Sequence, residues 1–114
     1  MTRPVSIAVC QFVIKPVKSF DAFARQVCRL LDQAQGADLV LFPELFTLAL
    51  FTTFDDWRNK PVKELVKVDR YTKEYRAFFA DEAKRRQQHI VAGSHLEKKN
   101  GSFTSVVSLN TSFV

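Results

Sequence analysis

The stretch Ala37-Asp38-Leu39-Val40-Leu41-Phe42-Pro43-Glu44 decides the fold of this chain. Residues 37–42 are almost wholly apolar over the length of one strand, which is typical of a strand buried on both faces. Pro43 ends that strand, because proline lacks the N–H group that a central strand donates to its neighbour. The stretch therefore predicts a short buried strand, with Glu44 directly beyond its carboxyl end.

The residues before this stretch complete a strand–helix–strand unit. Residues 5–13 are rich in β-branched and apolar side chains and predict a first buried strand, which Lys15-Pro16 ends. Ser19 is a candidate helix N-cap, and Gly36 is a suitable helix end. Between them, apolar side chains recur at helical spacing: Phe20, Phe23, Val27, Leu30, Leu31 and Ala34. A unit of this length predicts two parallel strands with a right-handed crossover.

The residues after Glu44 predict a second helix and a hairpin. Residues 45–54 are apolar and fit either a helix or a loop, and residues 55–61 fit a connection. A helical pattern then runs to Gln88, with a buried side made of Tyr71, Tyr75, Phe78, Phe79 and Ala83. Residues 89–95 predict a third buried strand, and Asn100-Gly101 predicts a tight turn into an antiparallel strand over 103–109.

Together these elements predict an α/β fold in the order β-α-β-α-β-β, with a mixed sheet and helices on one face. Residues 1–114 form one continuous unit without repeats or linkers. The chain ends at residues 111–114 in a strand-like apolar segment with no closing helix, which we interpret as an incomplete domain. Eleven Phe residues, against one Trp and two Tyr, indicate a substantial core.

The composition excludes several classes of protein. With 46% hydrophobic and 25% charged residues, the chain is an ordinary globular protein. The net charge of +5 comes mainly from Lys and Arg interspersed with Asp and Glu between residues 58 and 86, as on a solvated helix face. No stretch is apolar for the length of a membrane span or a secretion signal. We therefore expect a cytoplasmic protein that binds neither nucleic acid nor membranes.

Glu44 is the strongest candidate for chemistry. Ligands of α/β sheets gather beyond the carboxyl ends of strands, where this residue lies. Pro43 restricts the backbone on both sides of its own amide and so directs the carboxylate. The apolar neighbours Phe42, Leu45 and Phe46 would desolvate the carboxylate and raise its pKa toward the range of a general base. The alternative is a surface glutamate that happens to follow a strand.

Three blocks of the sequence resemble, in order and spacing, the opening of the nitrilase (carbon–nitrogen hydrolase) superfamily. They are Val5-Ser6-Ile7-Ala8-Val9-Cys10-Gln11, the stretch from Ala37 to Glu44, and Ile90-Val91-Ala92-Gly93-Ser94 with the charged turn and Asn-containing strand that follow. In that family a Gln closes the first strand and a Phe-Pro-Glu segment presents the catalytic glutamate. The chain is therefore identified as the amino-terminal part of a superfamily member, and it most resembles an amidohydrolase branch.

The resemblance implies the amino-terminal part of an αββα sandwich and assembly into a homo-oligomer. It implies hydrolysis of a small amide or nitrile by a Glu-Lys-Cys set, with no metal and no organic cofactor. In such a set the cysteine attacks the substrate carbon, the lysine stabilises the oxyanion, and the glutamate accepts the thiol proton and later activates water. On this chain only Glu44 matches, as the general base.

The two cysteines do not replace the family nucleophile. Cys10 is expected inside the first strand and Cys28 inside the helix, and their spacing suits neither a metal site nor a redox pair. The lysines between residues 60 and 84 are expected on a solvated helix face, and Lys98 and Lys99 in an exposed turn. The matching lysine and cysteine are therefore absent from this chain.

The substrate pocket has three further candidates: Phe46, His95 and Asn110. His95 ends a strand near the expected pocket mouth, and Asn110 is placed to hold a turn at the same rim. His89 and His95 lack a carboxylate or thiol at ligand spacing, so both are interpreted as structural and no metal site is predicted.

These observations leave more than one function open. The first hypothesis is a carbon–nitrogen hydrolase of which this chain supplies the base and part of the pocket, and which is inactive as this chain alone. The alternative is a non-catalytic protein-interaction module derived from the same fold. A basic nucleic-acid binder is a third and weaker hypothesis, because no reader motif supports it.

Overall fold

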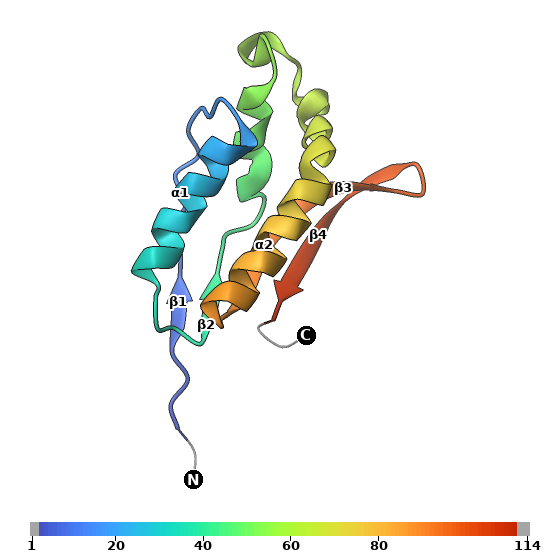
Figure 1. Ribbon diagram of the computed structural model, residues 1–114. Helices are drawn as coiled ribbons and strands as arrows, with labels where there is room; N and C mark the ends of the chain where they lie inside the picture. Colours follow the sequence, from blue (N-terminus) through green and yellow to red (C-terminus); the bar gives the residue numbers. More distant parts are fainter. Residues whose placement is uncertain (1–2, 112–114) are drawn as a thin grey trace.

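The computed structural model describes residues 3–111, which form a four-stranded sheet covered by two long helices (Figure 1). The strands are β1 (Ile7–Val9), β2 (Leu39–Leu41), β3 (His89–Lys99) and β4 (Ser102–Asn110), in that spatial order. β1, β2 and β3 are parallel, and β4 is antiparallel to β3. The predicted α/β fold with a mixed sheet is confirmed.

The helices α1 (Phe20–Gln33) and α2 (Thr72–Arg86) lie on the same face of the sheet (Figure 1). This follows from topology, because each parallel connection moves one strand in the same direction and right-handed crossovers then place both helices on one side. α1 begins where Ser19 was expected to cap it, with the Ser19 Oγ accepting a hydrogen bond from Ala22 N–H at 3.1 Å. Gly36 follows the helix with φ +93°.

The first two strands are shorter than the predicted ranges 5–13 and 37–42, because a strand extends only as far as its partner. β2 is limited by Pro43, and β1 pairs with β2 alone. Asp38 fastens the start of this pair, since its carboxylate accepts hydrogen bonds from the Arg3 guanidinium and from Ser6 N–H. These bonds lower the pKa of Asp38.

The segment after Glu44, left open between helix and loop, is a 3₁₀ helix, η1 (Phe46–Thr53). A short turn, η2 (Trp57–Asn59), interrupts the expected connection. The predicted long helix up to Gln88 is two elements, a 3₁₀ helix η3 (Val62–Tyr71) that continues directly into α2. The predicted helical character of this region is therefore confirmed, and its first part, residues 62–71, takes the 3₁₀ form.

The core lies between the helices and the sheet and is built around Phe46. Its ring centroid lies 5.1 Å from Phe12, 5.6 Å from Phe23, 5.2 Å from Phe42 and 5.9 Å from Phe79. These aromatic side chains come from both helices, from the segments that follow β1 and β2, and from η1, so one cluster joins the helices to the sheet. The substantial core that the high Phe content predicted is found here.

β3 contains a bulge that changes which side chains face the helices. Its pairing with β4 shifts between Val91 and Ser94. Before the bulge, Ile90 and Ala92 point into the core. After it, His95 stacks on Tyr75 of α2 with ring centroids 4.6 Å apart. The bulge therefore moves the helix-facing positions from even to odd numbers, and Ser94 falls on the opposite face.

The hairpin turn between β3 and β4 forms as predicted, with φ +51° at Asn100 and +79° at Gly101. β4 runs slightly beyond the predicted range 103–109 at both ends. The expected apolar end at residues 112–114 lies outside the described residues. In the part of the chain that the structure describes, no helix is both long and apolar enough to cross a membrane.

The face of the sheet opposite the helices is apolar and open to solvent. One row across it consists of Val9, Leu41, Val91 and Leu109, which pair with one another in register. Val9 and Leu109 at the two ends are 75% and 62% exposed. Side chains of this kind normally lie inside a protein, so this face is shaped for contact with another layer.

Candidate active site

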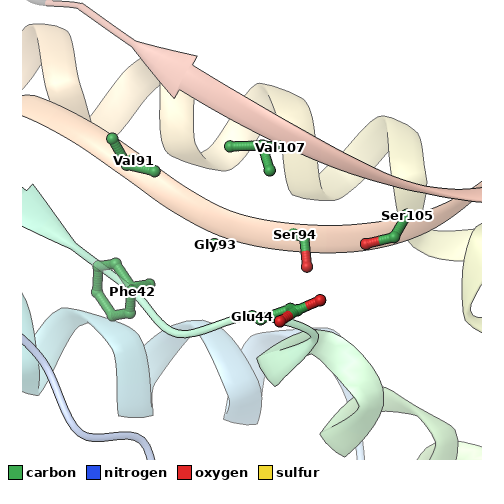
Figure 2. A pocket seen from close by; sticks show the side chains of 7 residues that line it. All are labelled: Phe42, Glu44, Val91, Gly93, Ser94, Ser105 and Val107. Carbon is green, nitrogen blue, oxygen red and sulfur yellow. The ribbon is translucent and has the colours of Figure 1, made fainter.

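An open cavity of about 530 Å³ lies on this face, beyond the carboxyl end of β2. Figure 2 shows the side chains around it, and its lining combines apolar groups with three polar ones: Phe42, Val91, Gly93 and Val107, and Glu44, Ser94 and Ser105. A mostly apolar cavity with a few converging polar groups is the usual form of a small-molecule site. The position also agrees with the general rule that ligands of α/β sheets bind beyond the carboxyl ends of parallel strands.

Glu44 lies on the rim of this cavity, two residues after Phe42, which also lines it. Figure 2 shows the Ser94 hydroxyl directed toward the Glu44 side chain. Glu44 is exposed in the described part of the chain. Its apolar neighbours therefore do not shield the carboxylate from water as the sequence predicted. The reason is that Phe46, and most of Phe42, turn into the core instead of covering the carboxylate.

The backbone directly after Glu44 is strained. Leu45 has φ +54° and ψ +25°, a left-handed conformation that costs a residue with a side chain roughly 1–2 kcal/mol. Its N–H group donates to two acceptors of one residue, the Ser94 Oγ at 3.0 Å and the Ser94 carbonyl oxygen at 3.1 Å. Strain of this kind persists only where the surroundings hold it, and it is concentrated at functional sites.

Gly93 lets the segment before Glu44 approach β3. Its φ is +63°, and a Cβ atom there would lie 2.1 Å from the Pro43 carbonyl oxygen and 2.8 Å from Phe46 Cδ1. No other residue type leaves that space empty. The backbone at Pro43, directly before Glu44, therefore packs against the bulge of β3.

Two of the three predicted pocket residues do not reach the cavity because they face the core side of the sheet. Phe46 is 1% exposed and forms the centre of the core. Asn110 pairs with Ile90 on the helix-covered face, and its side-chain amide donates to the Ile90 carbonyl oxygen at 3.5 Å. Neither is among the residues that line the cavity.

His95, the third, is fully buried behind the cavity wall. Its ring lies between two hydroxyl groups, with Nδ1 2.7 Å from Thr47 Oγ1 and Nε2 2.9 Å from Thr72 Oγ1. Thr72 donates its hydroxyl hydrogen to Asp69, so it accepts from Nε2–H, and Nδ1 accepts from Thr47. Burial lowers the pKa of His95, which favours this neutral form. The structural interpretation fits this position.

Sequence reasoning missed the two serines that line the cavity, Ser94 and Ser105. Simple alternation along β3 would have placed Ser94 toward the helices with Ala92. The signal that could have found it is the Gly before it, since a glycine inside a strand often marks a bulge.

The cysteines and lysines of the described chain lie away from the cavity. Cys10 follows β1 rather than lying inside it, and Cys28 is half-buried on α1, where its thiol donates to Glu82 at 3.7 Å. Burial raises the pKa of both thiols, which makes them poor nucleophiles. Lys98 and Lys99 are exposed in the hairpin. Residues 3–111 contain no group of three metal-ligating side chains.

This architecture matches a solved structure, the carbon–nitrogen hydrolase from Helicobacter pylori G27. The match has a TM-score of 0.62 and 18% sequence identity, and it covers 92% of this chain and 34% of that chain. The chain carries part of the carbon–nitrogen hydrolase fold. The predicted partial αββα architecture is thereby confirmed at the level of this fold.

A curated relative supports the same hydrolase relationship. The protein named "Probable hydrolase YhcX" from Bacillus subtilis (strain 168) is 32% identical over 108 residues, which are 93% of this chain and 21% of the relative. The chain thus spans about a fifth of that hydrolase and a third of the carbon–nitrogen hydrolase of known structure. No family model matches the sequence. These likenesses support the predicted resemblance to part of a nitrilase-superfamily protein, and what they show of this chain is the fold.

Proposed function

We propose that this chain supplies the general base, Glu44, and one wall of the active site of a carbon–nitrogen hydrolase that acts on a small amide or nitrile. The observation that carries the proposal is the place of Glu44, at the carboxyl end of a parallel strand and on the rim of a cavity. The left-handed backbone at Leu45 and the close approach of Pro43 to Gly93 support the proposal, because strained backbone is concentrated at functional sites.

In the proposed reaction, Glu44 accepts the proton of a cysteine thiol as the thiolate attacks the amide carbon. The protonated Glu44 then gives that proton to the departing nitrogen, which leaves as ammonia or an amine. Water next transfers a proton to Glu44 and adds to the thioester, and the thiol recovers the proton when the carboxylic acid leaves. A lysine would stabilise the negative oxygen in both additions.

The cysteine and the lysine must come from outside the described residues, because the cavity lining in 3–111 includes neither type. The open apolar face gives a place for the segment or chain that carries them. A layer packed on Val9, Val107 and Leu109 would close the cavity and remove water from Glu44.

The test is Glu44→Gln in the complete protein that contains this sequence, assayed by ammonia release from small aliphatic amides. We expect kcat to fall at least about 100-fold, because the general base is lost, while the unfolding temperature stays unchanged. Glu74→Gln is the matched control, since Glu74 is exposed on α2 and makes the same chemical change. Full turnover by Glu44→Gln would remove Glu44 from the proposed role.

A second prediction concerns the chain of 114 residues alone. We expect it to release no ammonia from amides or nitriles, because the nucleophile is lacking and a covalent mechanism cannot begin without it. Hydrolysis by the purified chain that disappears in Glu44→Gln would contradict this expectation and would require a nucleophile within residues 1–114.

The open apolar face also favours a second candidate function, a protein-interaction module without catalysis. Five apolar side chains of β1 and β4 and the segment before β1 are mostly exposed: Val5, Ile7, Val9, Val107 and Leu109. A surface of this kind normally meets a partner. Light scattering of the chain alone and an amide assay of the complete protein discriminate the two functions. A stable, monodisperse oligomer in the first and no turnover in the second would favour the interaction module.

A further inference from the structure

The segment that carries Glu44 is joined to β3 through two consecutive residues, Ser94 and His95. Ser94 bonds to Leu45, the residue after Glu44, and His95 bonds to Thr47, the third residue after it. We propose that Ser94 and His95 are the positioning residues of Glu44. This proposal rests on the proposed function, because it concerns how the base is held rather than whether it acts.

Ser94 is suited to hold the turn because it is 2% exposed and presents two acceptors to one N–H group. The left-handed Leu45 has no glycine-like freedom, so its conformation needs these bonds to persist. The Ser94 hydroxyl accepts from Leu45, so its own hydrogen can donate to a second group, and Figure 2 shows the hydroxyl oxygen on the side of Glu44. Ser94 thus acts on the backbone beside Glu44 from within the cavity wall.

His95 holds the other end of the same segment through a chain of three hydrogen bonds. Asp69 accepts from Thr72, Thr72 accepts from the His95 Nε2–H, and the His95 Nδ1 accepts from Thr47. Thr47 and His95 are both fully buried, so water does not compete for these bonds. The start of η1 is therefore fixed to β3 and to η3 at once.

The two contacts lie on opposite faces of β3 because consecutive residues of a strand alternate, and the bulge at Gly93 determines that Ser94 is the one that faces the cavity. Ser94 reaches the turn from the cavity side and His95 reaches η1 from the helix side. Together with the contact between Pro43 and Gly93, they define the backbone before and after Glu44. A displacement of about 1 Å at a catalytic group can lower a rate by roughly 100-fold, which makes such fastening consequential.

The experiment uses the complete protein and compares Ser94→Ala with Ser94→Thr, which keeps the hydroxyl. Thr47→Val removes the hydroxyl bound by His95 with little change of shape. Ser102→Ala is the matched control, because Ser102 lies at the exposed hairpin end of β4, opposite Lys99. For each variant, kcat and KM are measured with a small amide, and hydrogen–deuterium exchange is followed in the peptide that covers residues 43–48.

We expect Ser94→Ala and Thr47→Val each to lower kcat about 10- to 100-fold while KM changes less than about twofold. Exchange should rise in residues 43–48 and stay unchanged in α1. Ser94→Thr should restore most of kcat, and Ser102→Ala should match the wild type. If Ser94→Ala fails to fold, Thr47→Val and Ser94→Thr still decide the outcome.

Two results would overturn the proposal. One is a wild-type kcat in both Ser94→Ala and Thr47→Val while Glu44→Gln is inactive. The other is a rise of exchange over the whole chain with no change confined to residues 43–48, which indicates a purely structural role. Activity in Glu44→Gln would instead reject the proposed function of Glu44. The exchange data would then still show whether the Ser94–Leu45 and His95–Thr47 contacts hold residues 43–48 in place.

Discussion

A methyl group at position 93 would lie 2.1 Å from the Pro43 carbonyl oxygen, a distance that non-bonded atoms do not reach. The same position has φ +63°, where alanine is strained. At Gly101 only the second effect exists, because φ is +79° and no atom lies within 4 Å of the added group. The two glycines therefore separate backbone strain from steric overlap.

We predict that Gly93→Ala destabilises the protein by at least about 2 kcal/mol more than Gly101→Ala does, because its neighbours are backbone and core atoms that cannot easily move. Urea unfolding of the two variants measures the difference. Equal stabilities would show that the segment around Pro43 shifts freely. In that case Gly93 would not fix the position of the backbone that carries Glu44.

His95 predicts a dependence of stability on pH. Its pKa is lowered in the folded protein by burial, with Glu97 and Asp69 acting to raise it and Arg76 to lower it. The unfolded chain, with an ordinary histidine pKa of about 6.5, then binds more protons than the folded chain just below that pH. Stability is thus full above about pH 6.5 and falls as the pH decreases through the window below it.

The measurement is the unfolding midpoint of the wild type and of His95→Gln between pH 5 and 7. Glutamine can donate to Thr72 and accept from Thr47 but does not titrate, so its curve should be flat where the wild-type curve declines. The carboxylates with lowered pKa, Asp38, Glu64 and Glu82, contribute at lower pH and are common to both proteins. Parallel curves would contradict the assignment to His95.

Glu44 could be placed from the sequence because one local signal, a proline after an apolar strand, sets its position. The pocket partners could not be placed in the same way. Whether Ser94 or His95 faces the cavity depends on the bulge, and the bulge depends on how closely Pro43 approaches Gly93 in three dimensions. Phe46 was misplaced for a related reason, since an apolar residue next to a base can serve either the pocket or the core.

At the scale of elements, α1 shows the most reliable agreement between sequence and structure. Its N-cap, its apolar stripe and the glycine after it are local signals that all agree. The strand ends depend on partners far away in sequence, and the predicted ranges 5–13 and 37–42 were too long. The 3₁₀ form of η1 and η3 was not foreseen, because residues three apart lie near one face in both helix types and short apolar spacings do not separate them.

We predict that Ser19→Ala destabilises the protein by about 1 kcal/mol, because Ala22 N–H loses its acceptor at the start of α1. Ser19→Asp should retain most of the stability, since aspartate caps helices as well as serine does. Thermal unfolding followed by circular dichroism compares them. A loss of the same size in both variants would argue against a capping role.

At the scale of the whole molecule, the four layers expected for an αββα sandwich are present only in part. Residues 3–111 provide one helical layer and one sheet, and the other face of that sheet is open. The overall class was predictable because strand order follows from two right-handed crossovers and one hairpin. The occupant of the open face was not predictable, since nothing within a strand identifies its partner layer.

We predict that the double substitution Val9→Thr and Val107→Thr lowers the binding of a hydrophobic dye by the chain of 114 residues and leaves its helix content unchanged. Threonine keeps the β-branched shape on an exposed strand while reducing apolar surface. Ile90→Thr is the contrasting control, because Ile90 is fully buried and its substitution should unfold the chain. Unchanged dye binding in the double variant would locate the apolar surface elsewhere.

The two thiols with raised pKa have a practical consequence for labelling. Maleimide reagents react with thiolate, which Cys10 and Cys28 form less readily than an exposed cysteine does. A cysteine introduced at Ser102, on the solvated hairpin, should therefore take up one equivalent of dye at neutral pH before either native cysteine reacts. A fluorophore attached there would report on the approach of whatever covers the sheet, with the native sequence otherwise intact.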